Sequence, residues 1–226
     1  MKKYITEIHC HTGDVSGCGQ VPAEELVEIY IEKGYDSLVI TDHINGDTHN
    51  RLLINRPWEE AVDLYLEGYE KAKAAAKGRI NIILGLEVAF RGEYNDYLTY
   101  GITKDFLLNY PDMHLSKLED YVKYAHENGA IVFQAHPFRN NMTIKSPDLL
   151  DGIEIYNGHP RHDSRNDIAG MWAKKYNLKV CCGSDFHEKG DEARAGIITD
   201  VPITDSIQLA KILKNGEFEM KRADLT

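Results

Sequence analysis

Two histidines that are two residues apart, His9 and His11, directly follow an expected strand, Tyr4–Ile8. Residues two apart in an extended strand point to the same side, so both imidazoles can converge on one point just past the strand end. Imidazole is a common ligand of zinc and iron. Because such a pair also occurs by chance at solvated strand ends, its chemistry depends on which other side chains the fold brings beside it.

Four later strands are also expected to end in residue types that bind metal, namely His43, Glu87, His136, and Asp185 with His187. Five separate strands are unlikely to end in metal-binding residue types at the same edge of the fold by chance, so the pattern predicts a metal centre. Imidazole and carboxylate together suit zinc, manganese or iron, and the sulfur-rich sets of structural zinc sites are missing. A shared carboxylate such as Glu87 could bridge two ions, and two or three ions can activate a water for displacement at phosphorus.

Each of these residues also has a purely structural interpretation. A single histidine at a strand end is more often a surface or hydrogen-bonded residue, and His136-Pro137 could simply end a strand. Asp42, which precedes His43, could be a turn residue, or it could orient a metal ligand from behind. The metal interpretation therefore depends on the whole set and not on any one member.

The other five histidines are less informative. His159 and His162 follow a later strand and could approach the centre. His114 precedes a helix and His126 lies within one, so we expect both to face solvent. His49 lies in a polar segment, residues 44–56, between an expected strand and an expected helix.

The elements that must position these residues alternate between strand and helix. Strands are expected at residues 4–8, 37–41, 80–86, 97–102, 130–135, 152–156, 178–182 and 196–199. Helices are expected at residues 22–33, 58–77, 117–128, 165–176 and 206–215. This alternation predicts an α/β fold with parallel strands. Ligand-type residues at the carboxyl ends of several strands favour a barrel, because an open doubly wound sheet would gather them at one switch point.

Composition limits the class of protein. The chain has 226 residues, 42% of them hydrophobic, which is enough for a sizeable core, and its net charge is -10. This charge argues against a large basic surface for nucleic acid or an anionic membrane, although a small basic pocket would be compatible with it. Four cysteines without a C-x-x-C motif indicate a reducing compartment, and Cys181 and Cys182 in an apolar strand are expected to be buried. No signal-peptide core and no apolar run of about 18 residues is present, so we expect a cytoplasmic protein.

The ordered set of motifs resembles the PHP family, whose name stands for polymerase and histidinol phosphatase. The motifs are His9-Cys-His11, Thr41-Asp42-His43, Gly85-Leu-Glu87, Ala135-His136-Pro137 and Ser184-Asp185-Phe-His187. They cover about residues 8–187 in the family's order, and together they are highly specific. The resemblance implies a single domain over residues 1–226 with a distorted (β/α)7 TIM-like barrel. It also implies a centre of two or three metal ions that hydrolyses phosphoesters.

The resemblance also assigns ligands to each ion. It implies that His9, His11, Glu87 and Asp185 hold one ion. Glu87 and His136 would hold a second, with Glu87 bridging the two. His43 and His187 would contribute to a third. His43, His187 and Asp185 would make up the catalytic set, and His43 or His187 could donate a proton to the leaving group.

Two departures from the family's pattern put ligands in doubt. Many members have a histidine where this chain reads Asn95-Asp96-Tyr97, so Asp96 could substitute as an oxygen ligand or could simply begin a strand. The family often has Ser-Asp-Gly after the first motif, where its aspartate helps to bind the third ion. This chain reads Ser16-Gly-Cys18-Gly, so Asp14 or Cys18 could fill the role, or the third ion could be weakly held. Cys18 could equally be a buried structural thiol.

Phosphate binding also requires cationic side chains, and guanidinium groups bind phosphate in a fork. Arg139, just past His136-Pro137, is the best candidate, and Arg161 and Arg194 follow on neighbouring loops. Each could instead be an ordinary surface arginine. Asn157 at a strand end could contact substrate or a ligand, or could cap a loop.

The sequence thus predicts a metal-dependent phosphoesterase, a phosphatase or a phosphodiesterase, in which a metal-activated hydroxide attacks phosphorus. The expected partner is a small phosphorylated substrate, such as a phosphomonoester or a small nucleotide, and we expect neither long nucleic acid nor a membrane. Two alternatives are metal-dependent hydrolysis of carbon–nitrogen bonds, and a PHP module that binds metal without catalysis. The sequence does not indicate an oligomeric state.

Overall fold

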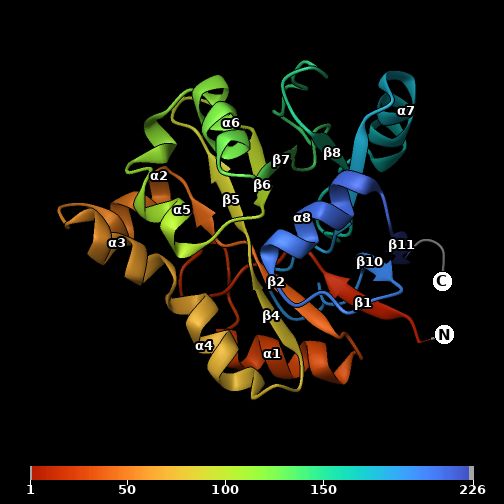
Figure 1. The fold of residues 1–226 in the computed structure, drawn as a ribbon, viewed down its shortest axis with the longest axis horizontal. Helices are drawn as coiled ribbons and strands as arrows, with labels where there is room; N and C mark the ends of the chain where they lie inside the picture. Colours follow the sequence, from red (N-terminus) through yellow and green to blue (C-terminus); the bar gives the residue numbers. More distant parts are fainter. Residues whose placement is uncertain (1, 224–226) are drawn as a thin grey trace.

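The computed structural model, which describes residues 2–223, contains two mixed β-sheets surrounded by helices (Figure 1). The first sheet has the strand order β11 (Glu219–Arg222), β10 (Ala195–Thr199), β1 (Tyr4–Glu7), β2 (Ser37–Ile40) and β4 (Asn81–Leu84). The second has the order β3 (His43–Ile44), β5 (Leu86–Ala89), β6 (Asp96–Tyr100), β7 (Ile131–Gln134), β8 (Gly152–Asn157) and β9 (Lys179–Gly183).

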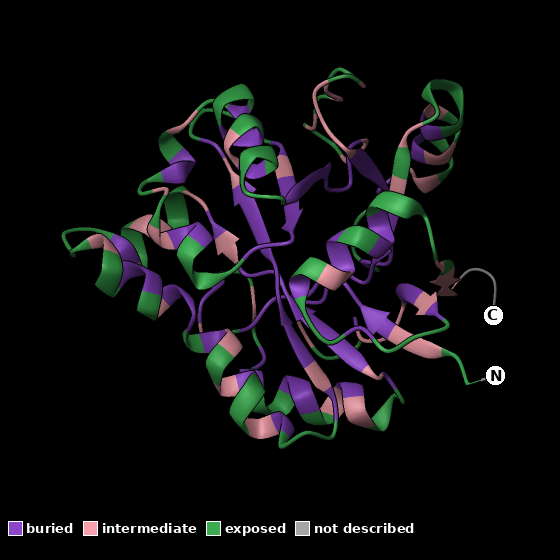
Figure 2. Ribbon diagram, in the orientation of Figure 1, coloured by how far each residue is buried: buried purple, intermediate pink, exposed green. Residues whose placement is uncertain are grey.

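Helices cover the outside of the two sheets. They are α1 (Ala23–Glu32), α2 (Gly46–Thr48), α3 (Trp58–Tyr65), α4 (Glu67–Ala76), α5 (Lys104–Leu108), α6 (Leu118–Glu127), α7 (Asn166–Tyr176) and α8 (Ser206–Asn215), with a π-helix η1 (His49–Leu53) and a 3-10 helix η2 (Met113–Leu115). Figure 2 shows most of the strands buried and the outward helix faces exposed. Apolar side chains of both sheets and of α8 share one core cluster, which fixes the sheets against each other.

Two backbone connections join the sheets near the expected ligands. β4 continues into β5 through Gly85, whose N–H donates to the Ile40 carbonyl at 2.9 Å. A Cβ at this glycine would lie 2.8 Å from the Thr41 side chain, so the close crossing requires glycine. On the other side, the Asp185 N–H donates to the His9 carbonyl at 2.9 Å. The ends of β1 and β9 are therefore held together.

The α/β single-domain fold is confirmed, whereas the expectation of parallel strands throughout is wrong. β6 runs antiparallel to β5 and β7, and β10 runs antiparallel to β1 and β11. The connection between β5 and β6 spans only residues 90–95, which is too short for the crossover that parallel pairing needs. Among residues 2–223 no sheet closes on itself, so the (β/α)7 barrel is not confirmed.

Two local expectations also change. The helix expected over residues 58–77 is two helices, α3 and α4, that meet at Leu66. His114, which we expected to face solvent, is fully buried in η2, although Cys181 and Cys182 are buried as expected. Within residues 2–223, every helix is too short or too polar to cross a bilayer. The cytoplasmic location stays a prediction.

Candidate metal centre

Four side chains from three strand ends meet at one buried point. His9 Nε2 lies 3.2 Å from Glu87 Oε2 and 3.3 Å from Asp185 Oδ1. His11 Nε2 lies 3.1 Å and 3.4 Å from the same two oxygens. All four side chains are buried. The expected first ligand group is therefore brought together.

These separations fit a bound cation better than a network of hydrogen bonds. Neither His9 Nε2 nor His11 Nε2 makes an aligned hydrogen bond within the described part of the chain. Ligands placed about 2.0–2.2 Å from one zinc ion would lie about 3.0–3.6 Å from each other, in tetrahedral or octahedral geometry. The observed separations fall in this range, so the donor set fits a divalent ion.

Glu87 is the centre of the arrangement because both of its oxygens face imidazoles. Oε2 lies 3.4 Å from His43 Nδ1, in addition to its contacts with His9 and His11. Oε1 lies 3.4 Å from His136 Nε2. In β-sheet register, His43 is the direct partner of Glu87 across β3 and β5. One carboxylate therefore has three imidazoles near one oxygen and a fourth near the other, the arrangement that a bridging ligand requires.

Asp96 lies on the side of Glu87 that faces His136. It opens β6 and lies opposite Ala89 in the antiparallel pairing with β5. Its Oδ2 is 3.8 Å from His136 Nε2, and its carboxylate lies within 4.8 Å of ligand atoms of His43 and Glu87. The hairpin between β5 and β6 is what places this carboxylate at the rim.

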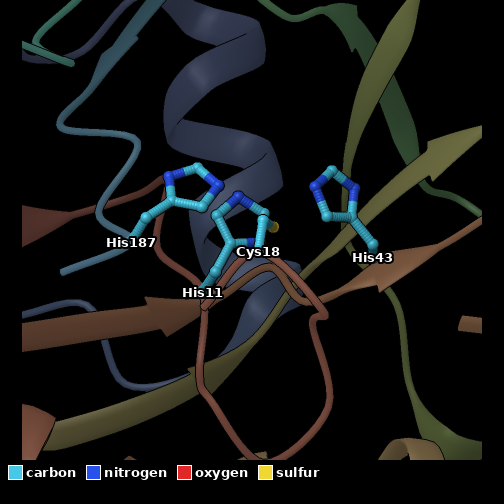
Figure 3. A group of neighbouring side chains, drawn as sticks. All are labelled: His11, Cys18, His43 and His187. Atoms are coloured by element: carbon cyan, nitrogen blue, oxygen red, sulfur yellow. The ribbon is translucent and has the colours of Figure 1, made fainter. Parts of the chain in front are cut away.

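A third group combines three histidines and a cysteine, namely His11, Cys18, His43 and His187, whose ligand atoms all lie within 4.8 Å of one another (Figure 3). The His11 ring stacks between the other two rings, with centroids 4.5 Å from His43 and 4.6 Å from His187. His187 Nδ1 lies 2.8 Å from the Asp185 carbonyl oxygen, which leaves Nε2 available as a ligand atom.

The structure distinguishes between Asp14 and Cys18, the two candidate ligands in the loop after His11. Asp14 accepts a hydrogen bond from the Ala23 N–H at 2.7 Å and pairs with Lys71 at 2.8 Å. Its carboxylate is therefore engaged at the start of α1. The loop instead turns Cys18 toward the histidines, with Gly19 packed so closely on Thr12 that a Cβ there would lie 2.4 Å from the Thr12 carbonyl oxygen.

Side chains behind the candidate ligands His11 and His43 contact them and limit their orientation. Ser16 Oγ donates to Asp42 at 2.7 Å, accepts from the His43 N–H at 3.0 Å and lies 3.3 Å from His11 Nδ1. Asp42 also accepts from the N–H and the hydroxyl of Thr12. Asp42 therefore does not contact His11 or His43 directly. It holds Ser16, and Ser16 in turn contacts both histidines.

Glu154, which the sequence reasoning missed, lies behind two other ligands. Its Oε1 is 2.9 Å from His9 Nδ1, and its Oε2 accepts from the His136 N–H at 3.0 Å. Asn157 also donates to Oε2, at 2.9 Å. The signal in the sequence was a single acidic residue inside the otherwise apolar strand 152–156.

Two of the candidate ligands, His136 and Asp185, have left-handed backbone, which non-glycine residues rarely adopt. The φ angles of His136 and Asp185 are 27° and 55°. Hydrogen bonds from their N–H groups, to Glu154 and to the His9 carbonyl, hold these conformations. Residues held in such backbone often lie at functional sites.

The buried charges shift one another's pKa. Burial alone would lower the pKa of His11, but Asp185 and Glu87 raise it to about 9. Burial alone would raise the pKa of Glu87, but the imidazoles of His9 and His43 hold it well below its usual range. Burial lowers the pKa of His43 to about 3. At neutral pH Glu87 is therefore ionised and His43 is neutral, which are the forms that bind divalent metal, whereas His11 carries a proton that a bound ion would displace.

Comparison with known proteins settles the family. The PHP domain profile matches residues 7–215, nearly the whole chain. The chain belongs to the PHP family. The resemblance drawn from the motifs is confirmed.

Three relatives show how far the likeness extends. A 5'-3' exoribonuclease of Haemophilus influenzae is 36% identical over 75 residues, 29% of this chain and 27% of the relative. A two-domain protein of Bacteroides vulgatus, with a predicted PHP-like metal-dependent phosphoesterase, superimposes with a TM-score of 0.70 at 18% identity. It is matched over 98% of this PHP domain and 65% of its own chain. Endonuclease Q superimposes with a TM-score of 0.62 at 16% identity, over 95% of this chain and 57% of its own. The PHP domain thus spans less than two thirds of each relative.

The Endonuclease Q structure overturns one expectation. It is a complex with a 27-mer duplex substrate that has an abasic lesion at the active site. We expected a small phosphorylated partner and not long nucleic acid, because the net charge is -10. This expectation is wrong, because a similar fold acts on duplex DNA. Metal ions and a few arginines can neutralise phosphates locally, so the charge of a whole PHP domain does not decide its substrate.

The three candidate arginines have different surroundings. Arg139 Nη2 donates to Asp185 Oδ2 at 2.7 Å and to Asn157 Oδ1 at 2.9 Å, beside the ligands of the PHP domain. Arg161 binds both oxygens of Asp191, at 2.6 and 2.7 Å. Arg194 Nε donates to the Gly158 carbonyl at 2.7 Å. Only Arg139 of these three contacts an expected ligand.

His159 reaches the edge of the centre, as the sequence allowed. Its ring centroid is 5.2 Å from that of His187 and 4.6 Å from that of His162. His126 is half exposed and pairs with Asp151, in agreement with its expected position outside the centre.

Proposed function

We propose that this PHP domain hydrolyses phosphoesters at a centre of two or three divalent zinc, manganese or iron ions, and that residues 1–226 form this one domain. The observation that carries the proposal is the position of Glu87, with imidazoles facing both of its oxygens. A carboxylate shared in this way suits a pair of adjacent ions.

The ligands divide into three sets. The first comprises His9, His11, Glu87 and Asp185; the second comprises Glu87, Asp96 and His136; and the third comprises Cys18, His43 and His187. We assign His11 to the first set alone, because one imidazole nitrogen binds one ion and its Nδ1 faces Ser16. Sets with three protein ligands leave a coordination position for water or substrate.

Bound ions would supply a nucleophile from water and would offset charge on the phosphoryl group. We assign Arg139 to bind the oxygens of that group, and the position of its guanidinium beside Asp185 supports this assignment. Arg161 and Arg194 would act from farther along the rim. Burial lowers the pKa of His187 to about 4, so it is neutral near pH 7. Neutral imidazoles at His43 and His187 suit ligation better than donation of a proton to the leaving group.

Elemental analysis together with a panel of substrates tests the proposal. The panel contains a phosphomonoester, nucleotides, single-stranded oligonucleotides, and duplex DNA with and without an abasic site. We expect His11→Ala to lose bound metal and phosphoester hydrolysis, while His126→Ala, which alters a histidine outside the centre, retains both. Full activity and unchanged metal content in His11→Ala would show that the site is wrongly placed.

The panel also separates the alternatives. Hydrolysis of amides or lactams without hydrolysis of phosphoesters would support the carbon–nitrogen chemistry. Metal-loaded protein that hydrolyses nothing in the panel would support a module that only binds metal. The side chains around Arg139 favour phosphoesters over both, because a guanidinium beside the metal ligands recognises an anionic group.

A further inference from the structure

A second group of metal-ligand side chains lies outside the centre around Glu87. It consists of His49, Asp112 and His114. His49 is the first residue of η1, which follows β3 and α2. His114 lies in η2 and Asp112 directly precedes it, in the connection before α6. The group therefore joins two segments that are more than 60 residues apart in the sequence.

The geometry of this group allows one ion to contact all three side chains. Their ligand atoms lie within 4.8 Å of one another. His49 Nδ1 is 3.9 Å from Asp112 Oδ1, and the ring centroids of His49 and His114 are 4.4 Å apart. The Asp112 side chain is 55% exposed, so an ion can reach the group from solvent.

Three of the four imidazole nitrogens of this group are buried without hydrogen-bond partners in the described part of the chain. His114 is fully buried, and neither of its ring nitrogens has a hydrogen-bond partner within residues 2–223. His49 Nδ1 is also buried and has no hydrogen-bond partner within residues 2–223. Buried polar atoms almost always have partners in folded proteins, so three orphaned nitrogens at one place require an explanation.

A hydrogen bond fixes the backbone that presents these nitrogens. The Arg91 N–H, just past β5, donates to the His114 carbonyl at 2.8 Å. The Arg91 side chain adds positive charge near His114, and the Asp112 carboxylate opposes it. A cation at this place would therefore depend on Asp112, which makes that residue the most informative one to alter.

We propose that His49, Asp112 and His114 bind a zinc ion that is separate from the catalytic centre, with water in the fourth coordination position. Two imidazoles and one carboxylate are zinc ligands, whereas magnesium and calcium prefer oxygen. The ion ties η1 to the segment before α6. Its existence does not depend on the proposed hydrolysis.

Zinc binding by variants of the full chain tests this proposal. Wild type, Asp112→Asn and His49→Gln are dialysed against zinc, and bound zinc per chain is measured by elemental analysis. Each variant is expected to bind one ion fewer and to gain less in melting temperature when zinc is added. Asp105→Asn, which alters an exposed carboxylate in α5, serves as a matched control and binds as much zinc as wild type.

The same experiment distinguishes this site from the centre around Glu87. In an Asp185→Asn background, which weakens that centre, the Asp112-dependent ion is expected to remain. Phosphoester hydrolysis, if the proposed function holds, is expected to persist in Asp112→Asn. Equal zinc content in wild type, Asp112→Asn and His49→Gln overturns the proposal and leaves the proposed function untouched.

Discussion

Glu154 Oε1 lies 2.9 Å from His9 Nδ1, on the edge of the imidazole opposite the nitrogen that faces Glu87 and Asp185. Both side chains are fully buried. The carboxylate therefore holds a proton on Nδ1 and leaves Nε2 free to bind an ion. A pairing of this kind sets the tautomer and raises the basicity of a metal ligand.

Glu154→Gln is expected to weaken metal binding. The amide nitrogen would meet either His9 Nδ1–H or the donors on His136 and Asn157, so one of these contacts is lost. We expect metal affinity to fall by about 10–100-fold, measured by competition with a chromophoric chelator. Glu127→Gln, on the exposed end of α6, is the control. Equal affinity in wild type and Glu154→Gln would show that the carboxylate does not orient His9.

Glu7→Ala is expected to destabilise the fold. The buried Glu7 carboxylate accepts hydrogen bonds from the N–H groups of His9 and Ser184, at 3.1 and 2.9 Å, and from the Tyr30 hydroxyl at 2.9 Å. It therefore ties the ends of β1 and β9 to α1. Loss of these bonds should lower the free energy of unfolding by about 3 kcal/mol or more, and Tyr30→Phe by about 1.5 kcal/mol. Urea denaturation measures both, with the exposed Glu24→Ala as control; a smaller effect of Glu7→Ala than of Tyr30→Phe contradicts this account.

Cys18→Ser is expected to change the third ligand set. Thiolate ligands favour soft metals, and the sulfur lies among the rings of His11, His43 and His187. Protein loaded with Co²⁺ should show a thiolate-to-metal charge-transfer band that Cys18→Ser lacks. Cys181→Ala, which alters a thiol buried in β9, should retain the band. A band that survives in Cys18→Ser would mean that Cys18 is not a ligand.

Asp96 should give the metal-free protein a recognisable pH dependence. Burial, together with the charge of Glu87, raises the pKa of Asp96 from 3.8 to about 7. Between these values the folded state keeps a proton that the unfolded chain releases, so this group lowers the free energy of unfolding as pH rises. Asp96→Asn removes the contribution.

Denaturation of the chelator-treated proteins from pH 4 to pH 7 measures this effect. Lowered pKa values at His43 and His187 act in the opposite direction, so the informative quantity is the difference between wild type and Asp96→Asn. The stability of wild type relative to the variant should fall as pH rises. A constant difference across this range would show that Asp96 is ionised throughout.

Arg139→Lys is expected to impair hydrolysis although it keeps the charge. The guanidinium contacts Asp185 and Asn157 through Nη2, and an ammonium group cannot reproduce its planar fork. We expect kcat/KM on a phosphoester to fall by about 100-fold, comparable to the loss of one transition-state donor. Arg56→Lys, which alters an exposed arginine paired with Glu60, is the control. Equal kcat/KM in wild type and Arg139→Lys excludes a role for the fork.

The types and order of residues at strand ends were enough to indicate the family and the main ligand groups. His9 and His11 are one strand period apart, and Glu87, His136 and Asp185 each follow an apolar run. Such patterns are local, because a strand that ends at a given residue presents it at the edge of a sheet wherever the sheet lies. The family's motifs then supplied the order in which these strand ends should occur.

Tertiary structure decided the rest, because it depends on contacts between distant segments. The choice between Asp14 and Cys18 followed from Lys71 and the start of α1, which engage the aspartate. The antiparallel direction of β6 followed from the length of one connection, and the two-sheet arrangement from pairing between distant strands. Glu154 contacts His9 across 145 residues of sequence. No local pattern encodes such a contact, so the sequence determined which groups could bind metal, and the fold determined which carboxylates support them.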